Sequence, residues 1–147
     1  STTTTKSSLD AWFKEAQNQE LNTKTKYTCC YPYDAKLIKA HQKLIQDKIN
    51  NIKDKKVRVL FSAHSLPVSI IKKGDPYQWQ VEQTVKAVML GIHGYEDHVL
   101  AYQSKVTPVK WLEQRHQAKL KMQLAKIGRW LLFQLRLSRI TLKHLLN

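Results

Sequence analysis

Apolar residues three and four positions apart predict three helices in the first 113 residues of the chain. The first helix begins near Ser7 or Ser8 and ends near Glu20, and its apolar stripe consists of Leu9, Trp12, Phe13 and Ala16. Asp34 caps a longer helix that ends near Asn51, with inward-facing Leu37, Ile38, Leu44, Ile45 and Ile49. The third helix runs from Pro76 to about Leu90, because Asp75 is a good N-cap and proline suits the first helical position.

Three short runs rich in β-branched and aromatic residues predict strands between these helices. The runs are Tyr27–Tyr33, Val57–Ala63 and His98–Gln103, so the elements alternate as β-α-β-α-β. This alternation requires a parallel sheet with right-handed crossovers. The fold class is therefore α/β, a doubly wound parallel sheet that forms one incomplete domain.

His64 is the strongest candidate for chemistry, because it directly follows the strand Val57–Ala63. Gly74 breaks the loop after it, and the helix from Pro76 follows, so His64 lies on a strand-to-helix connection. In open α/β sheets, ligands bind in the crevice at the carboxyl ends of the strands. A neutral imidazole is a common metal ligand, and with an unperturbed pKa of about 6.5 an imidazole accepts a proton at physiological pH.

Three blocks of the sequence resemble the ferrochelatases, the family that inserts ferrous iron into a porphyrin to make haem. FSAHSLP at 61–67 followed by GDPY at 74–77 is similar to the family signature. AYQSKVTPVKWL at 101–112 resembles the family's YQSKVGPxxWL segment, with Thr107 where the family usually has glycine. STTTTKSSL at 1–9 resembles the Ser/Thr-rich opening of a helix near the middle of the family's chain. The blocks stand in the family's order, so residues 1–113 resemble a contiguous ferrochelatase fragment.

The resemblance implies a chelatase-like fold and a lyase of haem biosynthesis that releases two protons as Fe²⁺ enters protoporphyrin IX or coproporphyrin III. His64 corresponds to the family's metal-binding and proton-accepting histidine, and it is the catalytic and metal residue that the sequence predicts. Fe²⁺ and porphyrin are then substrates, and no tightly bound cofactor is expected. The partner of this histidine in the family is a glutamate in a later motif resembling PIAFVSDHIETL, which this chain lacks. We therefore expect this fragment to be inactive by itself.

The composition changes abruptly after Glu113. Residues 114–147 contain eight Lys or Arg and no Asp or Glu. If the third base of each codon from Trp130 to Leu145 is read with the first two bases of the next, the genetic code permits VVIPIAFVSDHIETL, which contains the missing motif. Our hypothesis is that a frameshift near codon 113 replaced the family's final segment with an out-of-frame tail.

The alternative for residues 114–147 is a basic amphipathic helix that binds an anionic membrane or nucleic acid. Of the net charge of +14, this segment supplies +8, and the 17 basic and 11 acidic residues before it leave +6. The sequence contains no helix-turn-helix, zinc-finger or aromatic-basic RNA motif, so nucleic acid is not the expected partner. The longest uninterrupted apolar stretch in the segment, Trp130–Phe133, is far shorter than a membrane span. We expect a helical tail whose amphipathicity is accidental.

The chain divides into a helix and linker at 1–26, an incomplete chelatase-like domain at 27–113 and the basic tail at 114–147. Cys29 and Cys30 are adjacent in a predicted strand and point to opposite faces, so no iron–sulfur cluster is expected. Buried cysteines in a reducing cytoplasm are the preferred interpretation. We expect a cytoplasmic location, with peripheral contact with the inner face of the membrane as an alternative.

Several other residues invite a functional interpretation. His93, His98 and Glu96 could mimic a metal cluster, and Tyr77 and Trp79 could line a flat apolar ligand. Loop histidines at this spacing are more often surface groups, and aromatic residues at the start of such a helix more often pack on the sheet. Lys105 belongs to the YQSK block, whose residues are expected to shape the end of a strand.

Overall fold

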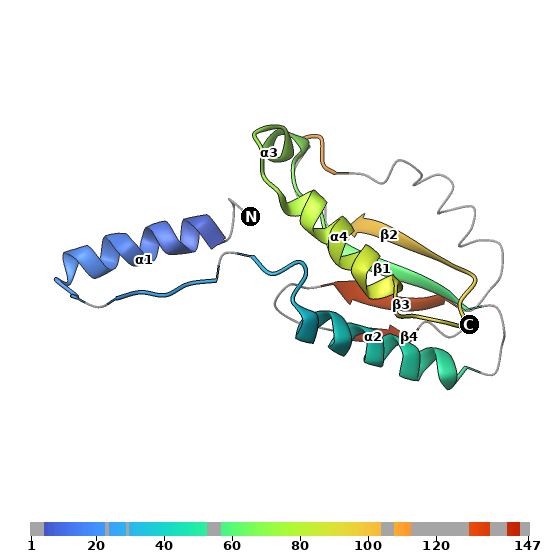
Figure 1. Ribbon diagram of the computed structural model, residues 1–147. Helices are drawn as coiled ribbons and strands as arrows, with labels where there is room; N and C mark the ends of the chain where they lie inside the picture. The colour runs from blue at the N-terminus through green and yellow to red at the C-terminus, as the bar shows by residue number, and fades with distance from the viewer. Residues whose placement is uncertain are drawn as a thin grey trace.

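The computed structural model describes residues 5–22, 24–28, 30–52, 57–103, 108–112, 130–135 and 141–144. Figure 1 shows its helices and strands. In chain order they are α1 (Ser7–Asn18), α2 (Ala35–Asn50), β1 (Arg58–His64), α3 (Val68–Lys72), α4 (Tyr77–Met89), β2 (Asp97–Gln103), β3 (Trp130–Leu135) and β4 (Thr141–His144).

The four strands form one sheet in the order β2-β1-β3-β4. β1 is central and pairs in parallel with β2 and with β3, while β4 runs antiparallel to β3. The register aligns His64 with Gln103 and Ala63 with Leu135, so the carboxyl ends of the three parallel strands lie at one edge of the sheet. This confirms the predicted α/β class and the parallel sheet.

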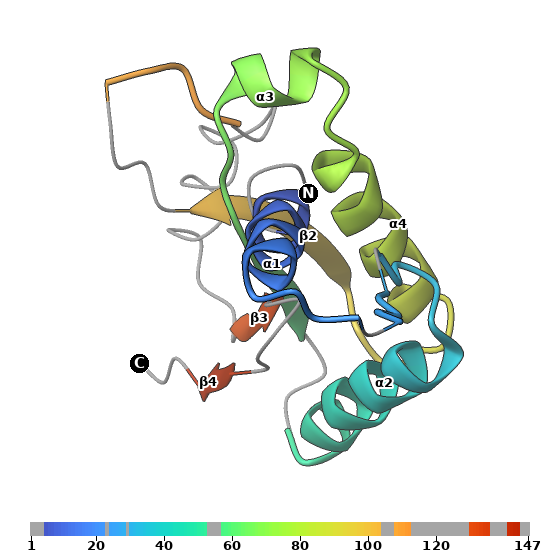
Figure 2. The ribbon, with the colours of Figure 1, turned by 90° about the vertical axis from the view of Figure 1, so that its left-hand side faces the viewer.

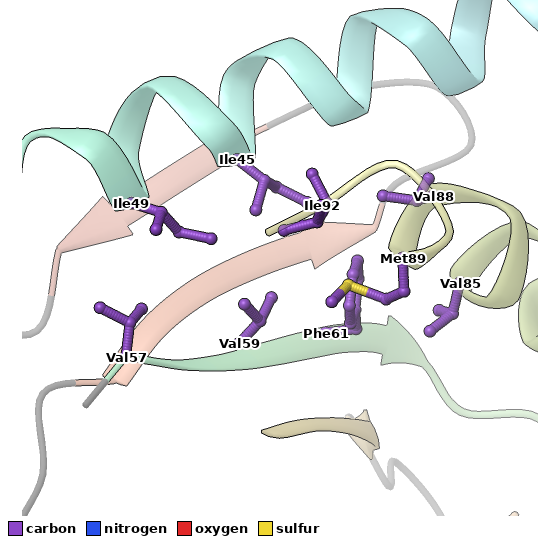
Figure 3. Close-up of a cluster of buried hydrophobic side chains, with 9 residues drawn as sticks. All are labelled: Ile45, Ile49, Val57, Val59, Phe61, Val85, Val88, Met89 and Ile92. Atoms are coloured by element: carbon purple, nitrogen blue, oxygen red, sulfur yellow. The ribbon is translucent and has the colours of Figure 1, made fainter. Parts of the chain in front are cut away.

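Helices α2 and α4 cover one face of this sheet (Figures 1 and 2). Alternate residues point toward them and are buried: Val59 and Phe61 of β1, and Val57 directly before it. Figure 3 shows how the two helices converge on these side chains. The remaining members of the buried cluster come from α2, α4 and the loop after α4: Ile45, Ile49, Val85, Val88, Met89 and Ile92.

The start of α2 follows directly from its local sequence. The carboxylate of Asp34 accepts a hydrogen bond from the backbone N–H of Leu37 at 2.8 Å, which satisfies one donor that the first turn leaves free. Ile45 and Ile49 then lie on the buried stripe, and so does His41, which the sequence analysis did not single out. The predicted bounds of α1, α2, α4, β1 and β2 agree with the structure to within about two residues, whereas the short helix α3 was expected to be loop.

Helix α1 projects away from the sheet (Figures 1 and 2). None of its residues is buried, although its predicted apolar stripe is present. Phe13 meets the ring of Tyr27 edge to face, and Trp12 donates a hydrogen bond from Nε1 to Thr25 Oγ1 at 3.0 Å. The segment that follows α1 thus folds back along it, but the predicted stripe does not reach the core.

The predicted strand Tyr27–Tyr33 is wrong in its described residues, which contain no strand. This segment crosses over α4 instead of joining the sheet. Thr84 Oγ1 donates to the carbonyl of Pro32 at 3.1 Å, and the Tyr33 ring meets Trp79 edge to face. A strand needs a ladder partner, and Pro32 has no N–H to offer one.

The helix predicted for the basic tail is also wrong in the part of it that the structure describes. Trp130–Leu135 and Thr141–His144 are strands β3 and β4. Parallel pairing with β1 gives β3 its backbone hydrogen-bond partners, so tertiary context overrides the helix propensity of this leucine-rich run. The remaining tail residues lie outside the described part of the chain.

Candidate site at the carboxyl edge of the sheet

His64 is the last residue of β1 and its side chain is exposed at the carboxyl edge of the sheet. The strand arrives there because Val59, Phe61 and Ala63 are completely buried, which fixes the direction of β1 through the core. Among the described residues, none forms a hydrogen bond with the imidazole of His64. The imidazole is therefore exposed and makes no hydrogen bond to this part of the chain.

The loop after His64 is hydrogen-bonded to the segment at residues 110–112. Ser65 is completely buried, and its N–H donates to the carbonyl of Gln103 at 2.7 Å while its Oγ donates to the carbonyl of Leu112 at 2.9 Å. Two backbone hydrogen bonds complete the junction, from Val68 N to Lys110 O at 2.9 Å and from Leu112 N to Leu66 O at 2.8 Å. Two of the three blocks that carry the family resemblance are thereby brought together beside His64, with Pro67 and Trp111 bridged between them.

Tyr77 connects the start of α4 to the end of β1. Its hydroxyl donates a hydrogen bond to the backbone carbonyl of His64 at 2.8 Å. Asp75 is buried, and its Oδ1 accepts a hydrogen bond from the N–H of Tyr77 at 2.8 Å. Burial raises the pKa of Tyr77 to about 12, so its hydroxyl stays protonated at neutral pH and remains a donor.

Tyr102 is a second tyrosine that the sequence analysis did not identify as a candidate. It lies near the end of β2, and its side chain is buried with Ala63, Val81 and Leu112. Its hydroxyl has no hydrogen-bond partner among the described residues, and burial raises its pKa above that of an ordinary tyrosine. Its place in the YQSK block was the only sequence signal that could have drawn attention to it.

His98 and Glu96, near the start of β2, contact other side chains of the fold. The His98 ring meets Phe61 and Tyr95 edge to face, and Glu96 forms an ion pair with Arg58 at 3.2 Å. No group of three or more His, Cys, Asp or Glu side chains in the described ranges could hold a metal ion. The cluster of His93, Glu96 and His98 that the sequence suggested is therefore not assembled.

Two further candidates do not gather around His64. Trp79 is exposed and packs against Tyr33 with ring centroids 6.0 Å apart. Cys30 is free and exposed, which corrects the expectation of buried cysteines, because the segment that carries it is not a strand. Cys29 and Lys105 lie outside the described residues.

The fold and the position of His64 are those of an α/β protein whose candidate site lies at the carboxyl edge of a parallel sheet, the usual place for ligand sites in this class. The sequence model of the family described as Ferrochelatase matches residues 1–132. The chain belongs to the ferrochelatase family.

Curated relatives named ferrochelatase are similar over most of this chain. The protein of Rickettsia bellii (strain OSU 85-389) is 49% identical over 114 residues, which cover 77% of this chain and 30% of the relative. The protein of Pelagibacter ubique (strain HTCC1062) is 46% identical over 114 residues, covering 76% and 32%. For Wolbachia sp. subsp. Brugia malayi (strain TRS) the identity is 45% over 122 residues, covering 82% and 36%. The chain spans about a third of the length of the curated relatives it matches.

No helix in the described ranges is both long enough and apolar enough to cross a bilayer.

Proposed function

We propose that this chain supplies part of the site of an enzyme that inserts Fe²⁺ into a porphyrin, with release of two protons, to form haem. Its family membership supports the reaction class. The observation that carries the assignment to a residue is the exposed His64 at the end of β1, with its ring free of hydrogen bonds to described residues. Protoporphyrin IX and coproporphyrin III both fit this proposal as substrates.

His64 has two roles in this proposal. Its neutral imidazole coordinates Fe²⁺ as the ion loses water, and it accepts a proton that leaves a pyrrole nitrogen. Fe²⁺ is a substrate here, so the chain needs no tightly bound cofactor and no iron–sulfur cluster. We place the protein in the cytoplasm, with peripheral contact to the inner face of the membrane as the arrangement to be tested.

Metal titration of the 147-residue chain tests the role of His64. We expect calorimetric titration with Co²⁺, an air-stable divalent stand-in, to show a site that His64→Ala weakens by about tenfold or more, a loss of about 1.4 kcal/mol. His93→Ala is the matched control, because His93 is an exposed histidine on a loop. Equal affinity in His64→Ala and the unsubstituted chain would reject His64 as the metal ligand.

We expect catalytic turnover only in the protein made from a gene that has been restored to the length of the relatives. In that protein, His64→Ala should abolish porphyrin metallation, measured from the absorption change of the porphyrin. An undiminished rate would reject the proposed catalytic role.

The division into a helix and linker at 1–26, a chelatase-like domain at 27–113 and an out-of-frame tail at 114–147 is part of this proposal. The family match continues to residue 132, past the proposed boundary at residue 113. The reread sequence VVIPIAFVSDHIETL begins at Trp130, the first residue of β3, and the motif within it begins at Phe133. In the reread frame, an Asp-His-Ile-Glu sequence would follow a strand beside β1, on the side of the sheet's carboxyl edge where His64 lies. Sequencing the gene tests this proposal, and it fails if no one-base correction restores the motif.

A further inference from the structure

The backbone carbonyl of His64 lies at a place where the sheet offers no partner among the described strands. Neighbouring residues of a strand direct their N–H and C=O groups to opposite sides. Since Ser65 N–H bonds to Gln103 of β2, the carbonyl of His64 is directed to the β3 side. On that side the register ends at Ala63 and Leu135, one residue before His64.

The hydroxyl of Tyr77 donates to this carbonyl, for which the described strands supply no donor. It reaches the His64 carbonyl at 2.8 Å from the first residue of α4, 13 positions along the chain. A short hydrogen bond at this point restrains the residue that carries the exposed imidazole, because it fixes the peptide group that leads out of β1.

The position of Tyr77 is itself restrained from two directions. Asp75 Oδ1 holds the N–H of Tyr77 at 2.8 Å, and this carboxylate is buried. The Tyr77 ring packs against the buried cluster formed by Ala63, Val81, Tyr102 and Leu112. The hydroxyl therefore approaches the carbonyl from a ring that has little freedom to move.

We propose that Tyr77 is a positioning residue for His64, holding the end of β1 so that the imidazole is presented to the metal in a defined orientation. This inference rests on the proposed function, since it concerns the presentation of the same histidine. Tyr77 touches no substrate in this role and acts only through the backbone of His64.

Tyr77→Phe tests the proposal in the 147-residue chain, because it removes the hydroxyl and keeps the ring in its cluster. Calorimetric titration with Co²⁺ should show His64-dependent binding weakened by about twofold to fivefold; fivefold corresponds to about 1 kcal/mol, the usual net value of one hydrogen bond. The His64 ring signals in the NMR spectrum should broaden over a wider range of added Co²⁺. Tyr33→Phe is the matched control, because it also removes a tyrosine hydrogen bond, from the Tyr33 hydroxyl to Gln83 Oε1 at 3.0 Å.

Rescue separates positioning from general stability. Incorporation of p-aminophenylalanine at position 77 restores a donor on the same ring, and we expect it to recover most of the Co²⁺ affinity. This variant also keeps the test decisive if Tyr77→Phe fails to fold, because its affinity must then match that of the unsubstituted chain. Affinity in the p-aminophenylalanine variant no better than in Tyr77→Phe, or, if Tyr77→Phe does not fold, about twofold or more below that of the unsubstituted chain, would overturn the proposal.

The outcomes distinguish this inference from the proposed function. If His64→Ala itself leaves Co²⁺ binding unchanged, the proposed function fails and the positioning role fails with it. If His64→Ala weakens binding while Tyr77→Phe only lowers the melting temperature and retains full affinity, the proposed function stands and the positioning role of Tyr77 is rejected.

Discussion

Helices α1 and α2 both carry apolar residues at three- and four-residue spacing, but only α2 buries any of these residues in the core. α2 buries Ile45 and Ile49 against β1, and Ile45 is completely inaccessible to solvent. In α1 the two aromatic residues of the stripe remain 44% exposed at Trp12 and 46% exposed at Phe13. The comparison shows that an amphipathic pattern predicts a helix well, but that the surface it packs against decides how much the helix contributes to stability.

The largest expected difference comes from one substitution made in both regions. Phe61 in β1 is completely buried between α2 and α4, whereas Phe13 in α1 contacts mainly the exposed ring of Tyr27. Phe61→Ala should lower the free energy of unfolding by about 3–5 kcal/mol, because it leaves a cavity in the core. Phe13→Ala should lower it by less than about 1 kcal/mol. Urea denaturation measures both, and equal losses would refute the comparison.

Substitutions at the starts of the two helices should differ less in their effect on the free energy of unfolding than the two phenylalanine substitutions do. Asp34 accepts a hydrogen bond at the start of α2, while no side chain caps the start of α1. Asp34→Ala should lower the free energy of unfolding by about 1 kcal/mol. The control is Asp10→Ala in α1, which removes only an exposed ion pair with Lys6 worth about 0.3–0.5 kcal/mol. The same urea titration measures them, and a larger loss for Asp10→Ala would contradict the distinction.

Acidification should lower the stability of the folded chain through His41, the buried histidine of α2. Burial lowers the pKa of His41 from its usual value of 6.5, so the unfolded chain binds more protons than the folded chain below that pH. The stability contributed by neutral His41 is therefore fully present above pH 6.5 and is lost as the pH falls through the lowered pKa. His41→Leu should make the melting temperature less sensitive to pH between 7.5 and 5. An unchanged pH dependence would show that other groups dominate acid destabilisation.

Deletion of residues 1–20 should change the free energy of unfolding least. Because α1 buries none of its residues, the remaining chain should keep its free energy of unfolding within about 0.5 kcal/mol. Circular dichroism during urea denaturation measures this, with Phe61→Ala as the destabilised reference. A loss of several kcal/mol would show that α1 packs on the core in solution.

The sequence predicted the elements whose signals are local. Asp34 marks the start of α2, and the run from Val57 to Ala63 places His64 at the end of a parallel strand. These predictions succeed because capping, periodicity and a buried apolar run depend on residues close together in the chain. The family resemblance added the chemical meaning of His64, which spacing alone does not supply.

Only the tertiary structure decided what surrounds that histidine. The bond from Tyr77 to the His64 carbonyl and the junction of Ser65 with Leu112 join residues 13 and 47 positions apart. Pairing across the sheet turned Trp130–Leu135 into a strand, whereas the described residues of the segment 27–33 pair with no strand and form none. The physical reason is that strands and buried hydrogen bonds depend on partners distant in sequence, whereas helices and their caps carry most of their hydrogen bonds within themselves.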